Sequence, residues 1–272
     1  MRATGCHVEA RGEGARAVVL AHGFAGSARN WRPQVRALQD RWRVVTYDAP
    51  GHARSPAPAA AADYTLAAAT RALGEVVAGC GDRAPVVGGL SMGAAVALEW
   101  ALAVPTVPRA LVLAAFPAGP GSGRGISAHA AAFADAIDRY GLEAAGARFA
   151  WGPASGLDAR GRSWVRQGFL EHPAAALAHT LRGLLACLPS PEAQAERLAA
   201  LALPVLVLTG DGDAASLAAA SVLAQAGPHV TAEVVPAAGH VVNLVRPAVF
   251  NDRLAAFLEA LPPGSDPPRS RP

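Results

Sequence analysis

A serine stands between two glycines in the pentad Gly89-Leu90-Ser91-Met92-Gly93. The apolar residues 86–88 precede the pentad and a helix-forming pattern follows it, which predicts a strand, a sharp turn and a helix. Glycines on either side of the serine remove the Cβ atoms that would clash in so tight a turn. A hydroxyl held out on this turn is a candidate nucleophile for acyl transfer, because the helix that begins at Met92 directs free N–H groups toward developing negative charge.

Two later segments supply residues that could work with Ser91. Two aspartates, Asp211 and Asp213, follow the apolar run 204–209, and His240 follows the predicted strand 231–235. A serine hydroxyl needs a base to remove its proton, and a carboxylate can orient a histidine that acts as that base. Nucleophile, acid and base therefore occur in the order Ser, Asp, His, each just past the end of a predicted strand.

This order and placement resemble the α/β-hydrolase superfamily over nearly the whole chain. The loop 48–55 is similar to the family's Asp-x-x-Gly-His-Gly-x-Ser segment, with Ala53 in place of the second glycine. The resemblance implies an α/β fold, a mostly parallel doubly wound sheet of about seven strands with an inserted helical cap. It also implies that His52 orders loops beneath the site and takes no part in the chemistry.

The resemblance assigns roles to further residues. The family's acid comes three residues after the glycine that ends a strand, which favours Asp213 over Asp211 because Gly210 is that glycine. His240 is then the base and Ser91 the nucleophile. The segment His22-Gly23-Phe24 matches the family's His-Gly-x loop, so the expected oxyanion hole consists of the backbone N–H groups of Phe24 and Met92.

Only about one strand fits before the predicted strand 17–21, so the family's first antiparallel strand is expected to be missing or vestigial. Residues 117–200 show no strand alternation and predict a helical cap with helices at 127–140, 142–149, 163–171, 173–188 and 191–201. The hydrolase core then comprises residues 1–116 and 201–261. Residues 262–272, of which five are proline, are expected to be disordered. Because the cap leaves the sheet at its carboxyl edge, Phe116 and Trp151 are expected to contact the substrate.

The composition excludes several classes of protein. All 24 cationic residues are arginine, so neither a Schiff-base lysine nor a P-loop lysine exists. The arginines are scattered among 21 acidic residues, and no nucleic-acid partner is expected from a net charge of +3. The three cysteines have no metal-ligand spacing, and neither a metal nor a cofactor is predicted. No signal peptide is evident and no apolar run reaches the roughly 18 residues of a membrane span, which favours a cytoplasmic protein away from membranes. The oligomeric state is left open.

The leading hypothesis is a serine hydrolase that cleaves a small-molecule ester, thioester or lactone through an acyl-enzyme. Carbon-carbon bond hydrolysis or a lyase-type synthase is an alternative on the same triad, since residues 22–27 are similar to the opening of the menaquinone-pathway synthase. That synthase has an arginine four residues after its serine, where this chain has Ala95. A perhydrolase side reaction would need the same triad. A third alternative is a catalytically silent, ligand-binding homologue.

Overall fold

Seven strands form a single sheet in the computed structural model, which describes residues 5–152 and 159–262. The spatial order is β1-β3-β2-β4-β5-β6-β7, and every neighbouring pair is parallel except β1 and β3. The strands are β1 (Val8–Arg11), β2 (Ala17–Ala21), β3 (Arg43–Tyr47), β4 (Val86–Leu90), β5 (Ala110–Ala114), β6 (Val205–Gly210) and β7 (Val230–Val235). Within the described residues only β1 precedes β2, as expected, and this four-residue strand forms the antiparallel edge of the sheet.

The central strands are continuous runs of Val, Leu, Ala and Gly because helices cover both faces of the sheet. All residues of β2, β4, β5 and β6 are buried, the pattern of parallel strands that are enclosed on both sides. On one face of the sheet, the cluster of buried hydrophobic side chains includes residues of α2 (Leu66–Ala78), α3 (Met92–Ala103) and α8 (Ala214–Leu223). On the other face it includes residues of α1 (Arg32–Leu38) and α10 (Pro247–Ala260). This doubly wound arrangement is the predicted α/β fold.

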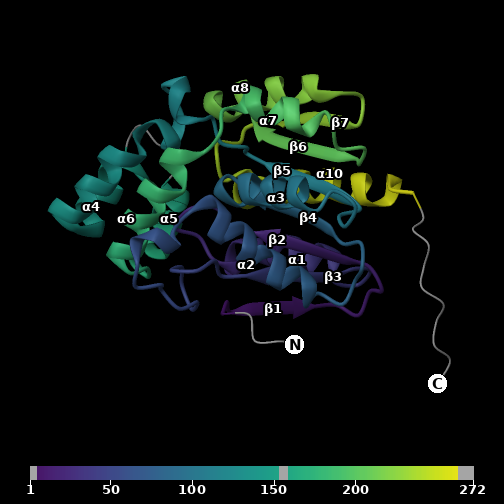
Figure 1. Cartoon of the computed structure of the whole chain (residues 1–272), viewed down its shortest axis with the longest axis horizontal. Helices are drawn as coiled ribbons and strands as arrows, with labels where there is room; N and C mark the ends of the chain where they lie inside the picture. The colour runs from purple at the N-terminus through teal and green to yellow at the C-terminus, as the bar shows by residue number, and fades with distance from the viewer. Residues whose placement is uncertain (1–4, 153–158, 263–272) are drawn as a thin grey trace.

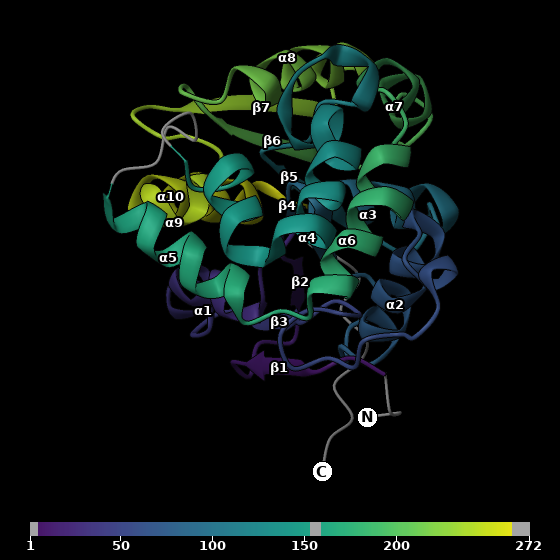
Figure 2. The same ribbon diagram turned by 90° about the vertical axis from the view of Figure 1, so that its left-hand side faces the viewer.

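The segment between β5 and β6 is helical in its described residues. It contains α4 (Gly125–Phe149), α5 (Ala159–Leu170), α6 (Ala174–Gly183) and α7 (Pro191–Leu198). The backbone of α4 is broken at Gly141, whose φ of 78° is accessible mainly to glycine, so this long helix is two segments divided where the sequence predicted a break. Helices α4, α5 and α6 gather beyond one end of the sheet (Figures 1 and 2).

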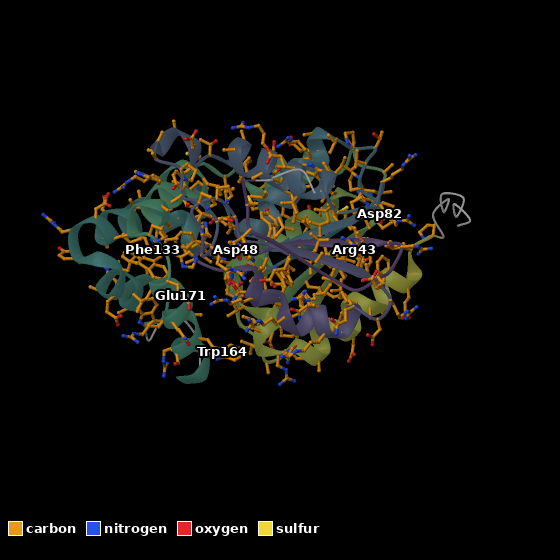
Figure 3. The ribbon with its side chains drawn as sticks, turned by 90° about the horizontal axis from the view of Figure 1, so that it is seen from below. Arg43, Asp48, Asp82, Phe133, Trp164 and Glu171 are labelled. Atoms are coloured by element: carbon orange, nitrogen blue, oxygen red, sulfur yellow. The ribbon has the colours of Figure 1, made fainter. Side chains whose placement is uncertain are left out.

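That end is the carboxyl end of the parallel strands. Arg43 begins β3 and Asp48 follows its last residue, and the side chains of the helical insertion, including Phe133, lie beyond Asp48 (Figure 3). Helix α7 differs from the other three, because it packs on α8 and α3 of the sheet layer. The insertion therefore returns to the core before β6 begins.

Two further predictions concern the ends of the chain and membranes. The predicted disordered tail, residues 262–272, lies outside the described residues except for Pro262. Among the described helices, none combines the length and apolar character that a membrane span requires.

Candidate active site

Ser91 occupies a strained turn between β4 and α3. Its φ of 54° and ψ of −114° lie outside the regions that L residues ordinarily adopt, as a nucleophile elbow requires. A Cβ on Gly89 would lie 2.7 Å from Ala94 N, and one on Gly93 would lie 2.6 Å from His22 O. Side chains at either position would force the strand, the helix and the neighbouring loop apart, so the two glycines of the pentad are structural requirements of this turn.

The loop after β2 passes directly beside this elbow. A Cβ on Gly23 would lie 3.6 Å from Ser91 Cβ and 3.3 Å from Leu90 O. Phe24 follows Gly23, and Gly26 N–H donates to Gly23 O at 3.0 Å to close a tight turn. The structure thus brings the His22-Gly23-Phe24 loop to Ser91 and to the N-terminus of α3, where Met92 is the first residue.

His22 holds this loop in place as a neutral side chain. Its Nε2 accepts a hydrogen bond from Ala49 N–H at 2.8 Å, so the proton is on Nδ1, which donates to Gly23 O at 2.8 Å. Burial lowers the pKa of His22 to about 4. A neutral histidine with this tautomer therefore fixes the carbonyl of the residue before Phe24.

Asp213 and His240 are in direct contact. Asp213 comes three residues after Gly210 at the end of β6, and His240 lies on the loop after β7, the neighbouring strand. His240 Nδ1 lies 2.6 Å from Asp213 Oδ2. Burial alone would raise the pKa of Asp213, but the hydrogen bond and charge of His240, with hydrogen bonds from Ser216, lower it to about 2. Asp213 is thus an anion that orients the ring of His240.

Asp211 has a different role. Its carboxylate accepts hydrogen bonds from the backbone N–H groups of Ala237 and Ala238, at 2.9 and 3.1 Å. These bonds lower the pKa of Asp211 and tie the end of β6 to the loop that carries His240. Of the two aspartates in Gly-Asp-Gly-Asp, Asp213 contacts the histidine and Asp211 supports the loop.

Ser91 and His240 are placed less closely. Ser91 is only 3% exposed, whereas 43% of the His240 side chain is exposed. Among the described residues no hydrogen bond joins the Ser91 hydroxyl to His240. The structure therefore joins Asp213 to His240, and a hydrogen bond between His240 and the Ser91 hydroxyl would require a movement of one of these two side chains.

Aromatic rings link the loop of Phe24 to the helical insertion. The ring of Phe24 meets those of Phe133 in α4 and Phe169 in α5 edge-on, with centroids 5.9 and 6.1 Å apart. Phe133 and Phe169 stack on each other at 5.6 Å. Trp151 contacts Phe169 at 5.3 Å and is 7% exposed. The two expected substrate contacts are thus both buried, Trp151 behind Phe169 and Phe116 at 2% exposure just after β5.

Two polar contacts tie the insertion to the same loop, and sequence reasoning missed both. The His172 ring lies between two carbonyl oxygens, with Nδ1 2.7 Å from Gly168 O and Nε2 3.0 Å from Gly26 O. Arg29 donates to Glu171 at 2.9 Å. The residues joined in the His172–Gly26 and Arg29–Glu171 contacts are more than 140 positions apart in the sequence, and no local pattern predicts either contact.

His52 packs between His22 and His172, with ring centroids 5.1 and 5.2 Å away. Burial lowers its pKa well below the usual value, and the two neighbouring histidines lower it further. Its Nδ1 lies 3.1 Å from Pro50 O. The ring is therefore neutral and holds the loop after β3. In the described part of the chain, no three His, Cys, Asp or Glu side chains gather as they would around a metal ion.

A sequence model of the alpha/beta hydrolase family matches residues 18–253, which include the elbow, both aspartates and His240. The chain belongs to this family. The match begins at the second residue of β2 and spans β3 to β7, together with the whole helical insertion.

Relatives of this alpha/beta hydrolase carry several names. It is 32% identical over 260 residues to a protein of Enterobacter cloacae named putative carbamate hydrolase RutD, covering 92% of this chain and 93% of that protein. It is 29% identical to the putative 2-succinyl-6-hydroxy-2,4-cyclohexadiene-1-carboxylate synthase of Bacillus subtilis, covering 90% and 91% of the two chains.

Solved structures agree on the fold. A thermophilic esterase from Thermogutta terrifontis superimposes with a TM-score of 0.81 at 25% identity, covering 94% of this hydrolase and 93% of the esterase. MenH from S. aureus superimposes with a TM-score of 0.80 at 21% identity, covering 93% and 98% of the two chains. The names of these proteins differ although the fold is shared, so the substrate must be argued from the site.

Proposed function

We propose that this alpha/beta hydrolase is a serine hydrolase that cleaves a small-molecule ester, thioester or lactone through an acyl-enzyme. Ser91 is the nucleophile, His240 the base and Asp213 the acid that orients it. The observation that carries the proposal is the 2.6 Å contact between His240 Nδ1 and Asp213 Oδ2 at the same sheet edge as the strained Ser91 elbow. An orienting carboxylate leaves Nε2 of the imidazole as the atom that can accept the serine proton.

The reaction proceeds in two halves. His240 Nε2 removes the proton from Ser91 Oγ as the oxygen attacks the substrate carbonyl, and the resulting imidazolium is stabilised by Asp213. The imidazolium then protonates the departing alcohol or thiol, which leaves the acyl group on Ser91. His240 then removes a proton from water as the water oxygen attacks the acyl-enzyme. It returns that proton to Ser91 Oγ as the bond to the acyl group breaks, and the released product is a carboxylic acid.

Backbone N–H groups of Phe24 and Met92 form the oxyanion hole in this mechanism. The close approach of Gly23 to Ser91, and the position of Met92 at the first turn of α3, support the assignment. Removal of one such donor typically raises the barrier by about 3 to 4 kcal/mol. Because the donors are backbone groups, the Phe24 and Met92 side chains affect the shape of the pocket more than the hole itself.

The helical insertion acts as a lid over this site. Helices α4 to α6 lie at the carboxyl end of the strands, and rings from α4 and α5 contact Phe24. Such a lid admits substrate when it opens and excludes water when it closes. Its rings present an apolar surface, which favours an uncharged acyl group. We include Phe116 and Trp151 among the pocket residues. The proposed lid segment is residues 117–200, of which α7 packs on α8 and α3 of the sheet layer.

Carbamate cleavage is a second candidate, favoured by the name of a relative that matches over 92% of this chain. A carbamate carbonyl would use the same nucleophile, base and oxyanion hole. The synthase named among the relatives is a weaker candidate, because Ala95, four residues after Ser91, is 1% exposed and apolar. A methyl group there provides no cation for a carboxylate-bearing substrate. The same objection applies to carbon-carbon bond hydrolysis of carboxylated substrates.

Kinetics on a panel of p-nitrophenyl esters, acyl thioesters, lactones and carbamates tests the proposal. Wild type is expected to turn over at least one of the first three classes, and Ser91→Ala none of them. Turnover of carbamates alone would favour the second candidate. If folded wild type turned over nothing and failed to react with a fluorophosphonate, the proposal would be wrong and a silent binding protein would replace it.

We also infer a cytoplasmic location, supported by the reduced thiols of Cys80 and Cys187.

A further inference from the structure

A polar hollow of about 320 Å³ lies at the β1 edge of the sheet, away from the active site. Three of its lining residues are the arginines Arg11, Arg32 and Arg36, and Glu9, Gln39 and Thr46 complete its polar lining. In the sheet order, β3 and β2 separate β1 from β4, which carries Ser91 at its end. The hollow is therefore a separate feature from the catalytic edge.

The fold brings these side chains together in a regular way. On β1, Glu9 and Arg11 are two residues apart and share a face, and Thr46 of β3 is paired directly with Glu9. Arg32, Val35 and Arg36 of α1, with Gln39 at its C-cap, follow the spacing of one helix face, and that face lines the hollow together with β1. Leu38, on another face of α1, is buried in the core. The edge strand and one helix face thus form the two walls.

The charge of the hollow is positive and unbalanced. Within the described residues, the side chains of Arg11, Arg32 and Arg36 make no hydrogen bond or ion pair. Glu9 already has partners, because Arg54 donates to it at 2.5 Å and His7 Nε2 lies 3.4 Å from the same oxygen. Arg54 also pairs with buried Asp48 at 2.8 Å. Arg54 balances only one of those two carboxylates, so three guanidinium groups face one remaining negative charge.

We propose that this hollow binds the phosphate group of a small phosphate-bearing molecule. Guanidinium groups form paired, charge-assisted hydrogen bonds with phosphate oxygens, and converging arginines are the typical means of holding that group. Arg32 and Arg36 lie four residues apart on α1, where like charges repel each other, and a bound dianion offsets that repulsion. The volume lies at the lower end of the range for small-molecule pockets, about 300 to 1,000 Å³. A free phosphate ion or a phosphate ester would satisfy the same chemistry.

Calorimetric titration of the full chain with inorganic phosphate, and separately with adenosine monophosphate, tests this site. Wild type is expected to bind at least one of the two, with an affinity that falls as salt is added. The double variant Arg32→Ala/Arg36→Ala should bind about tenfold more weakly or worse, and each single variant should fall between. Arg71→Ala is the matched control, because Arg71 is an exposed arginine of α2 on the opposite face of the sheet.

The two probes distinguish the sources of the phosphate. Equal affinity would identify the free ion as sufficient, and tighter binding of adenosine monophosphate would identify a phosphate ester. Ser91→Ala should bind both as wild type does, since the hollow is independent of the triad. The proposal is overturned if wild type binds neither probe at millimolar concentration. It is also overturned if the folded double variant binds like wild type, or if Arg71→Ala loses as much affinity as the double variant.

Discussion

His240 Nδ1 lies 2.6 Å from Asp213 Oδ2, joining the loop after β7 to the loop after β6. Asp213 is also the N-cap of α8, where its Oδ1 accepts from Ser216 N–H at 3.2 Å. The carboxylate is thus held by a helix on one side and holds the histidine on the other. The helix cap therefore fixes the Asp213 carboxylate independently of the exposed loop that carries His240.

Replacement of this carboxylate should slow catalysis without unfolding the protein. Asp213→Asn keeps a good N-cap residue, but its amide no longer favours the required tautomer and cation of His240. We expect kcat to fall by about 10³ to 10⁴, less than in Ser91→Ala or His240→Ala. Asp211→Asn is the control, expected to keep kcat within about tenfold because Asp211 contacts only loop backbone. The reverse ranking in steady-state assays would reassign the acid to Asp211.

The same contact predicts a pH-dependent difference in stability. In the folded protein the pKa of Asp213 is lowered from 3.8 to about 2, so its ionised form stabilises the fold. This contribution, about 2 kcal/mol, is complete above the unfolded pKa and is lost as pH falls toward 2. Urea unfolding of wild type and Asp213→Asn should therefore give free energies that converge on acidification from 3.8 toward 2. A constant difference across that range would contradict the ion pair.

The elbow predicts that one glycine of the pentad tolerates no side chain. In Gly93→Ala the new methyl carbon would lie 2.6 Å from His22 O, and we expect the free energy of unfolding to fall by about 1 to 3 kcal/mol. Gly121→Ala is the matched control, because a Cβ there meets nothing within 4 Å and should leave stability almost unchanged. Equal unfolding midpoints for the two variants would show that the elbow has room to relax.

Some elements of the fold and of the site could be predicted from the sequence and others could not. The central strands were predictable because enclosed parallel strands are unbroken apolar runs, and Ser91 and Asp213 follow two such runs. His240 follows the edge strand β7, which is partly exposed and includes Thr231 and Glu233. The break in α4 was predictable near Gly141. The contact of His172 with Gly26, and the convergence of Arg11 with Arg32, were not, because they depend on how separate elements pack. The sequence predicted one helix over 173–188. In the structure α6 ends at Gly183 and a separate short 3-10 helix (Leu185–Cys187) follows it.

The lid predicts a role for Trp151 in catalysis as well as in stability. Trp151 packs over Gly146 and against Phe169, whose ring meets Phe24, so Trp151→Ala should loosen the rings above the site. We expect unfolding free energy to fall by about 3 to 5 kcal/mol, and kcat/KM to change for some substrates of the panel. Tyr140→Ala, at a side chain that is 60% exposed on α4, should change neither. Unchanged kcat/KM for every substrate with folded Trp151→Ala would remove Trp151 from the pocket.

The central claim is that Ser91 becomes acylated. If it does, His240→Ala and Ser91→Ala should both lose turnover while their circular dichroism spectra stay the same as that of wild type. Loss of either residue should lower kcat by about 10⁶, because nucleophile and base act as one unit. These variants alone do not identify the atom that carries the acyl group.

Mass spectrometry of the protein quenched during turnover of a p-nitrophenyl ester tests that claim most directly. The account predicts one acyl group per chain, located on Ser91 in the peptide map, and no such adduct on Ser91→Ala. A wild-type protein that turns over the ester with the adduct on another residue, or a Ser91→Ala variant that turns it over at the wild-type rate, would contradict it.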